Sequence, residues 1–100
     1  MAHLLKVSEW KDPTGKWWVA DTSDLANDSA AWYHIARLLC DSIEDFIVLL
    51  KDKNAIINKW DPNGNNGKSL LTFYWTNYND AHQFLLYVNR IARNKGWTIC

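Results

Sequence analysis

The sequence has little of what marks the specialised protein classes. It contains only two cysteines, two prolines and four glycines in 100 residues, so it fits neither a disulfide-rich scaffold nor a disordered proline- or glycine-rich chain. No apolar run approaches the roughly 20 residues of a transmembrane helix, and Met1–Lys6 lacks the pattern of a signal peptide. We therefore expect a soluble, cytoplasmic protein with no membrane partner.

Net charge is also lacking, because 11 basic and 11 acidic residues cancel. A neutral chain has no general attraction for phosphate backbones, which argues against a nucleic-acid partner. The 48% hydrophobic content is ordinary for a globular protein and predicts a single α+β domain over residues 1–100. The unusual feature is seven tryptophans. Since each ring combines a large apolar face with an N–H that needs a partner, some are expected at a surface.

Alternating apolar residues and turn signals predict the strands. Leu4–Trp10 and Lys16–Asp21 flank a turn in which Pro13 suits a type I geometry and Gly15 a left-handed one. This register sets Trp10 opposite Trp18 on one face. Further strands are expected at Ala55–Trp60, Leu70–Thr76 and Trp97–Cys100.

Apolar residues at helical spacing predict three helices. Asp28, Asp41 or Ser42, and Asn77 or Asn79 are suited to cap their starts, whereas Asn54 and Gly96 are suited to end the second and third. The predicted order is ββααββαβ. It indicates an α+β fold, a mostly antiparallel sheet with helices packed on one face, partly ferredoxin-like in arrangement.

Two motifs begin in the Asn/Gly-rich segment and a third in the predicted strand after it, and all three remain incomplete. A phosphate-binding loop ending at Lys68-Ser69 would need glycine where Pro62 stands, and a helix after it. A calcium loop starting at Asp61 would need glutamate where Thr72 stands. An RNA-recognition strand would need a stacking aromatic where Leu70 stands. We therefore expect no cofactor and no bound metal.

Catalytic residues are not indicated either. His34 and Cys40 lie on different faces of one predicted helix, and no acyl-transfer signature surrounds them. A spatial pair of Cys40 with His82 is the remaining arrangement, but His82 lies off the apolar stripe of the last helix and is expected to be solvated. The sequence thus favours a protein that is not an enzyme.

The aromatic residues supply the candidate binding site. Most rings fall on predicted core stripes, but Trp10, Trp18 and Tyr74 are expected on the sheet face opposite the helices. Trp60 joins them if the strand parity shared by Ile56, Asn58 and Trp60 turns it outward. Clustered exposed aromatics mark interaction sites. The alternatives are that the Trp pair only stabilises its hairpin, or that a homodimer covers this face.

These observations predict a non-enzymatic protein-binding module, a small accessory or inhibitory protein that docks a larger partner. Its small size and lack of motifs match phage-encoded proteins that block host defence enzymes, anti-CRISPR proteins among them, by analogy only. The alternative is that the aromatic face of Trp10, Trp18, Trp60 and Tyr74 binds single-stranded nucleic acid or a small ligand.

Overall fold

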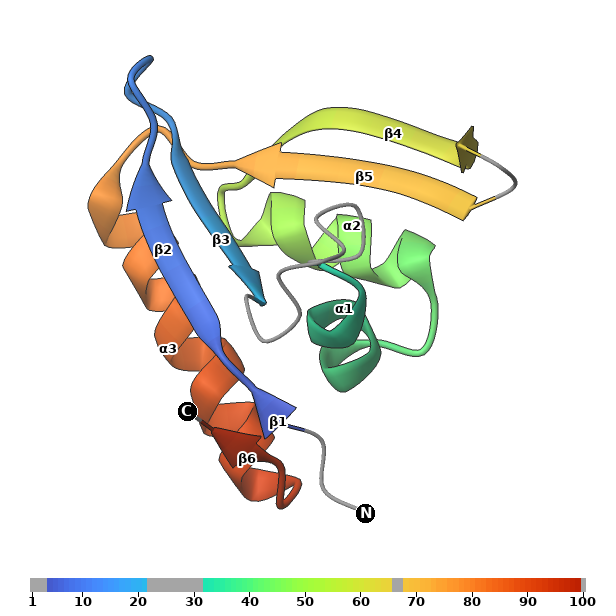
Figure 1. The fold of residues 1–100 in the computed structure, drawn as a ribbon, viewed down its shortest axis with the longest axis vertical. Helices are drawn as coiled ribbons and strands as arrows, with labels where there is room; N and C mark the ends of the chain where they lie inside the picture. The colour runs from blue at the N-terminus through green and yellow to red at the C-terminus, as the bar shows by residue number, and fades with distance from the viewer. Residues whose placement is uncertain (1–3, 22–31, 66–67, 100) are drawn as a thin grey trace.

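The computed structural model describes residues 4–21, 32–65 and 68–99, in which two β-hairpins pack on helices (Figure 1). The elements are β1 Leu4–Leu5, β2 Val7–Lys11, β3 Trp17–Asp21, α1 Tyr33–Leu39, α2 Ile43–Asp52, β4 Ile56–Asn65, β5 Lys68–Tyr74, α3 Tyr78–Asn94 and β6 Thr98–Ile99. This order confirms the predicted α+β class. None of the described helices is both long enough and apolar enough to cross a membrane.

The first hairpin has the register that the sequence predicts. Trp10 pairs with Trp18, and Ser8 pairs with Ala20. The turn closes with a hydrogen bond from Gly15 N to Asp12 O at 3.0 Å. Gly15 has φ +89°, a left-handed backbone that side chains rarely adopt, so glycine is required there.

The second hairpin, β4–β5, is longer than the sequence predicts and contains a bulge. Strand pairing continues into the Asn/Gly-rich segment, with Asn65 opposite Lys68. The register shifts between Ile57, which pairs with Phe73, and Lys59, which pairs with Thr72. The extra residue of such a bulge reverses the alternation of faces beyond it. Residues on the two sides of the shift therefore do not share the parity that the sequence suggests.

The two hairpins meet at one point instead of forming a continuous sheet. Trp17 and Trp75 exchange two backbone hydrogen bonds, each 2.8 Å long, and the hairpins diverge from there (Figure 1). β1 and β6 form a separate parallel pair. Antiparallel pairing thus dominates, as expected, but the ferredoxin-like resemblance is only partial because the strands divide into small sheets.

Local signals set the helix ends as predicted. Ser42 caps α2 by accepting from Asp45 N at 3.1 Å, and Asn77 caps α3 by accepting from Asp80 N at 2.9 Å. Asn54 and Gly96 adopt positive φ angles of 70° and 77° just past the helix ends. The predicted cap at Asp28 lies outside the described residues.

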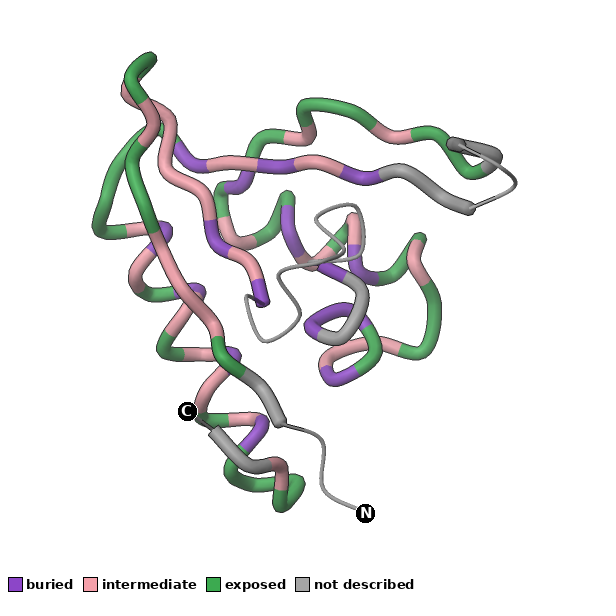
Figure 2. The backbone as a smooth tube through the Cα atoms, viewed as in Figure 1, coloured by how far each residue is buried: buried purple, intermediate pink, exposed green. Residues whose placement is uncertain are grey.

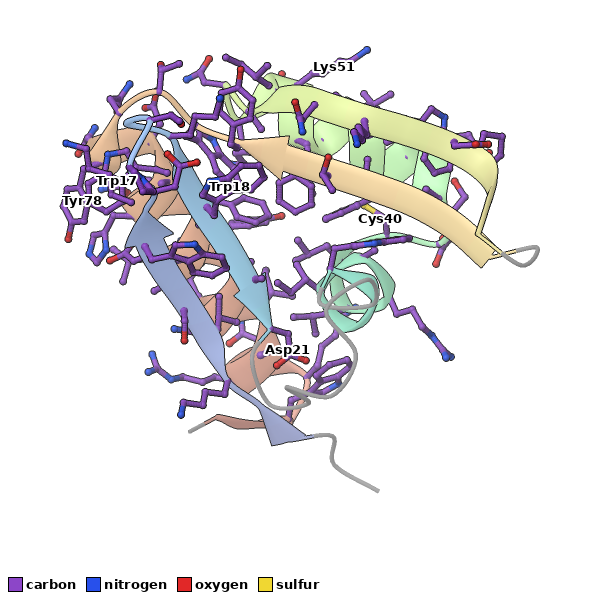
Figure 3. The ribbon with its side chains drawn as sticks, turned by 45° about the horizontal axis from the view of Figure 1, so that its top comes forward. Trp17, Trp18, Asp21, Cys40, Lys51 and Tyr78 are labelled. Atoms are coloured by element: carbon purple, nitrogen blue, oxygen red, sulfur yellow. The ribbon has the colours of Figure 1, made fainter. Side chains whose placement is uncertain are left out.

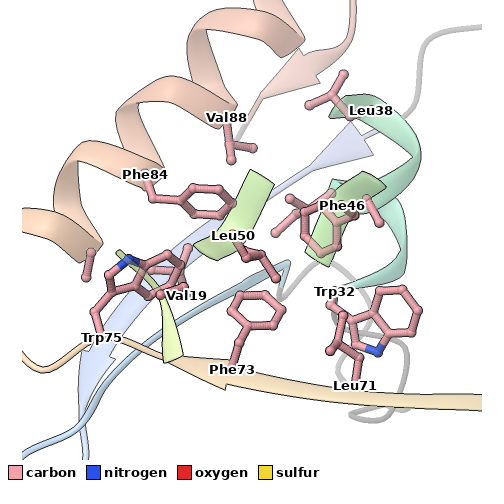
Figure 4. Packing of buried hydrophobic residues seen from close by; sticks show 14 of the residues in the cluster. Val19, Trp32, Leu38, Phe46, Leu50, Leu71, Phe73, Trp75, Phe84 and Val88 are labelled. Carbon is pink, nitrogen blue, oxygen red and sulfur yellow. The ribbon is translucent and has the colours of Figure 1, made fainter. Parts of the chain in front are cut away.

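The core lies between the hairpins and the helices, and the tube in Figure 2 is buried along their inner sides. A chain of ring contacts runs through this core, from Trp32 to Phe46, Phe73, Trp75 and Phe84 (Figure 4). Neighbouring ring centroids lie between 4.9 and 6.4 Å apart, within the range of favourable aromatic pairs. The chain connects β5 with both α2 and α3.

Candidate functional site

Four apolar side chains form a row across the outer faces of the two hairpins. Strand pairing sets Trp10 beside Trp18 in the first hairpin and Ile56 beside Tyr74 in the second. Trp18 and Tyr74 join the two halves, with ring centroids 5.5 Å apart and planes inclined by 48°. We call Trp10, Trp18, Tyr74 and Ile56 the outer row. It crosses all the strands of both hairpins.

The outer row is exposed at its ends and half-buried at its centre. Trp10 retains 44% and Ile56 40% of its accessible surface, whereas Trp18 and Tyr74 are half-buried. None of the four packs against the buried core cluster. Contiguous apolar surface of this kind marks interaction sites in soluble proteins.

Asp12, in the hairpin turn, fixes the central ring of the row. Its Oδ2 accepts from Nε1 of Trp18 at 2.8 Å. Its Oδ1 accepts from the Thr14 hydroxyl at 2.6 Å and from the backbone N of Lys16 at 3.0 Å. The hydrogen bonds from the Thr14 and Trp18 side chains hold the pKa of Asp12 well below the ordinary aspartate value.

We expect acid to weaken this turn. Because the folded-state pKa of Asp12 is depressed, its contribution to stability is complete above about pH 4 and is lost as the pH falls toward the folded-state value. Asp12→Asn should therefore lower the free energy of unfolding at pH 7. It should also reduce how much that free energy falls between pH 7 and pH 3. Urea unfolding of both proteins at the two pH values measures this. An unchanged pH dependence in the variant would contradict it.

Two lysines border the outer row. Lys16 Nζ lies 5.3 Å from the centroid of the Tyr74 ring. Lys59 pairs with Thr72, which places it on the same outer face, and Asn58 donates to the Thr72 hydroxyl at 3.2 Å. Within the described part of the chain, neither lysine forms an ion pair. The polar border of the row therefore carries positive charge.

The structure separates Trp60 from the other predicted site residues. Trp60 pairs with Leu71, whose side chain is buried, and it packs against the core cluster. The expected common parity of Ile56, Asn58 and Trp60 is wrong, because the bulge lies between Ile56 and Trp60. Ile56 occupies the outward position instead. Sequence alternation could not show that Ile56 and Trp60 lie on opposite faces, since a bulge leaves no unambiguous pattern in the sequence.

His82 differs from its prediction. Its position off the apolar stripe predicts a solvated side chain, but in the structure it contacts other residues. His82 Nδ1 lies 2.8 Å from Glu9 Oε1, and the imidazole stacks on Tyr78 at 5.1 Å. Tyr78 in turn meets Trp17 edge-on at 5.0 Å. These contacts attach the first hairpin to α3 and give His82 a structural role.

Cys40 lies at the end of α1. Figure 3 shows it far from Tyr78, on which His82 stacks, so the two residues do not form the spatial pair that the sequence left open. Burial raises the pKa of its thiol, with Asp45 and Asp41 adding to the effect, so the thiolate is disfavoured. Cys100, at the end of the predicted strand Trp97–Cys100, lies outside the described residues. No group of three His, Cys, Asp or Glu side chains suited to a metal ion occurs in the described ranges.

Comparison with protein-family models, curated proteins and solved structures found no match for this chain.

Proposed function

We propose that this protein is a non-enzymatic binding module, a small accessory or inhibitory protein that docks a larger protein through the outer row. The observation that carries the proposal is the continuity of the row. Side chains from two hairpins form one apolar surface, although none of them contributes to the core. Trp and Tyr are also enriched among the residues that dominate binding energy at interfaces.

The row supports a partner with an apolar centre and an acidic border. Lys16 and Lys59 would face that border, where opposite charge speeds association and favours the correct orientation. The indole of Trp18 is held by Asp12 and by Tyr74 before any partner arrives. A side chain that is already ordered loses less conformational entropy on binding, which improves affinity.

Ring geometry favours this function over binding of single-stranded nucleic acid. Stacked bases need open aromatic faces along a basic groove. Trp18 and Tyr74 are inclined by 48° and pack against each other, which removes much of their open surface. Salt dependence distinguishes the two functions, because phosphate contacts weaken steeply with salt and apolar docking does not.

Trp10→Ala tests the proposal. Trp10 is 44% exposed and outside the core cluster, so its loss should change the free energy of unfolding by no more than about 1 kcal/mol. Binding should fall by at least about 10-fold, as expected for an interface aromatic. The measurement is affinity capture from the source cell, followed by titration of the purified partner with each variant.

The matched control is Val48→Ala on α2, because Val48 is 66% exposed and lies outside the row. The proposal is supported if a partner binds wild type and Val48→Ala with equal affinity but binds Trp10→Ala much more weakly. Equal binding by all three proteins contradicts it. Sedimentation of the free protein tests the remaining alternative, that a second copy of this chain binds the outer row. A dimer that Trp10→Ala abolishes would assign the row to that second copy.

A further inference from the structure

A second surface feature is formed by residues at and just past the end of α2 together with residues of α3. A cleft of about 430 Å³ opens there, and its lining includes Lys53, Asn54, Gln83, Tyr87 and Arg90. This volume falls within the range of pockets for small organic molecules. The lining residues have no part in the proposed docking of a protein.

Two cations converge on one ring inside this cleft. Lys53 Nζ lies 4.4 Å and Arg90 Cζ 5.5 Å from the centroid of Tyr87. Neither cation forms an ion pair among the residues that the structure describes. Two like charges held at the same ring repel each other, and a bound anion would relieve that repulsion.

The backbone of both cationic residues is fixed before a ligand binds. Lys53 O accepts from Nε1 of the buried Trp75 at 2.9 Å, and Lys53 N donates to Leu49 O at 3.0 Å at the end of α2. Arg90 lies well inside the 17-residue α3. Side chains that start from rigid elements hold a ligand more accurately than those of loops.

Acidic residues also line the cleft, and they limit which anion fits. The Oδ2 of Asp80 accepts from Asn77 Nδ2 at 2.9 Å, so this carboxylate is engaged at the start of α3. Asp52 is the remaining negative charge in the lining. A ligand must therefore place its anionic group beside Lys53 and Arg90, with the amides of Asn54 and Gln83 as additional donors.

We propose that this cleft binds a small organic molecule through an oxyanion group, a phosphate or a carboxylate, held between Lys53 and Arg90. A guanidinium presents paired N–H donors that match either group. The cleft is larger than a single oxyanion, so the organic part of the ligand occupies the remainder beside Tyr87 and Leu86. This inference is independent of the outer row.

The test is an NMR titration of the labelled protein with phenyl phosphate and with benzoate, at constant ionic strength. Saturable shifts at Lys53, Asn54 and Arg90 are expected, with a Kd of about 1 mM for ligands of this size. Tighter phenyl phosphate binding assigns a phosphate, and tighter benzoate binding a carboxylate. Lys53→Gln and Arg90→Gln should each weaken binding by at least about 10-fold.

Lys51→Gln is the matched control, because Lys51 is an exposed cation of the same helix that does not line the cleft (Figure 3). It should bind the probes as wild type does. Asp52→Asn should tighten binding, since it removes a competing negative charge. Shifts that do not saturate, or equal losses in Lys51→Gln and Arg90→Gln, would overturn the proposal, because nonspecific attraction to surface cations would then explain the signal.

Discussion

Trp75→Ala is expected to destabilise the whole fold strongly. Trp75 is fully buried, and its backbone forms the only described bridge between the two hairpins. Its ring contacts Phe73 and Phe84, and its Nε1 donates to Lys53 O. Truncation of a buried aromatic costs about 3–5 kcal/mol. This is a large part of the roughly 5–15 kcal/mol that stabilises an ordinary domain.

Urea unfolding followed by tryptophan fluorescence measures this loss, and the midpoint should fall by roughly 2 M. Trp10→Ala is the matched control, because it removes the same ring from an exposed position and should leave the midpoint nearly unchanged. Trp75→Phe should recover part of the stability, since it keeps a ring but loses the hydrogen bond to Lys53 O. Equal midpoints for Trp75→Ala and Trp10→Ala would show that the bridge does not depend on this side chain.

Local features of the fold could be predicted because a few neighbouring residues determine them. Ser42 and Asn77 cap helices through hydrogen bonds to backbone N–H groups three residues ahead. Gly15 reverses the first hairpin, and this turn sets the pairing of Trp10 with Trp18. The fold class and three of the four outer-row residues, Trp10, Trp18 and Tyr74, could be predicted from such short-range signals and strand alternation.

The remaining features depend on contacts between distant residues. Glu9 and His82 lie 73 positions apart, so no local pattern pairs them. The bulge in β4 puts Ile56 and Trp60 on opposite faces, and its position depends on how β5 pairs with β4. The hydrogen bond from Trp18 to Asp12 is closer in sequence, but it requires the turn to be formed first. Alternation alone therefore could not separate Ile56, which lies on the outer face, from Trp60, which packs against the core.

The outer row also depends on how the hairpins meet. Trp10 and Trp18 belong to one hairpin, whereas Ile56 and Tyr74 belong to the other. The Trp17–Trp75 bridge lies immediately beside Trp18 and Tyr74 in the sequence, so it holds the two halves of the row in contact. Weakening of this bridge would break the continuous surface even where each hairpin stays folded. We therefore expect stability and the proposed docking to be coupled through this one backbone contact.

Phe46→Ala is the second substitution with a large expected effect. Phe46 is fully buried on α2, where its ring stacks near Trp32 at 6.4 Å and meets Phe73 edge-on at 5.8 Å. It therefore connects α2 to the second hairpin at the centre of the aromatic chain. The truncation leaves a cavity that the surrounding rings cannot fill, at a cost of about 3–5 kcal/mol. For a domain of this size, the Tm should fall by more than about 10 °C.

Val48→Ala is the matched control, because it lies two residues away on the same helix and is 66% exposed. Thermal unfolding of both variants by circular dichroism separates the loss of core packing from any general weakening of α2. Phe46→Leu should give an intermediate Tm, since it restores apolar volume but neither ring contact. If Phe46→Ala melted no earlier than Val48→Ala, α2 would not be held by this ring, and the aromatic chain would not be the element that joins the helices to the second hairpin.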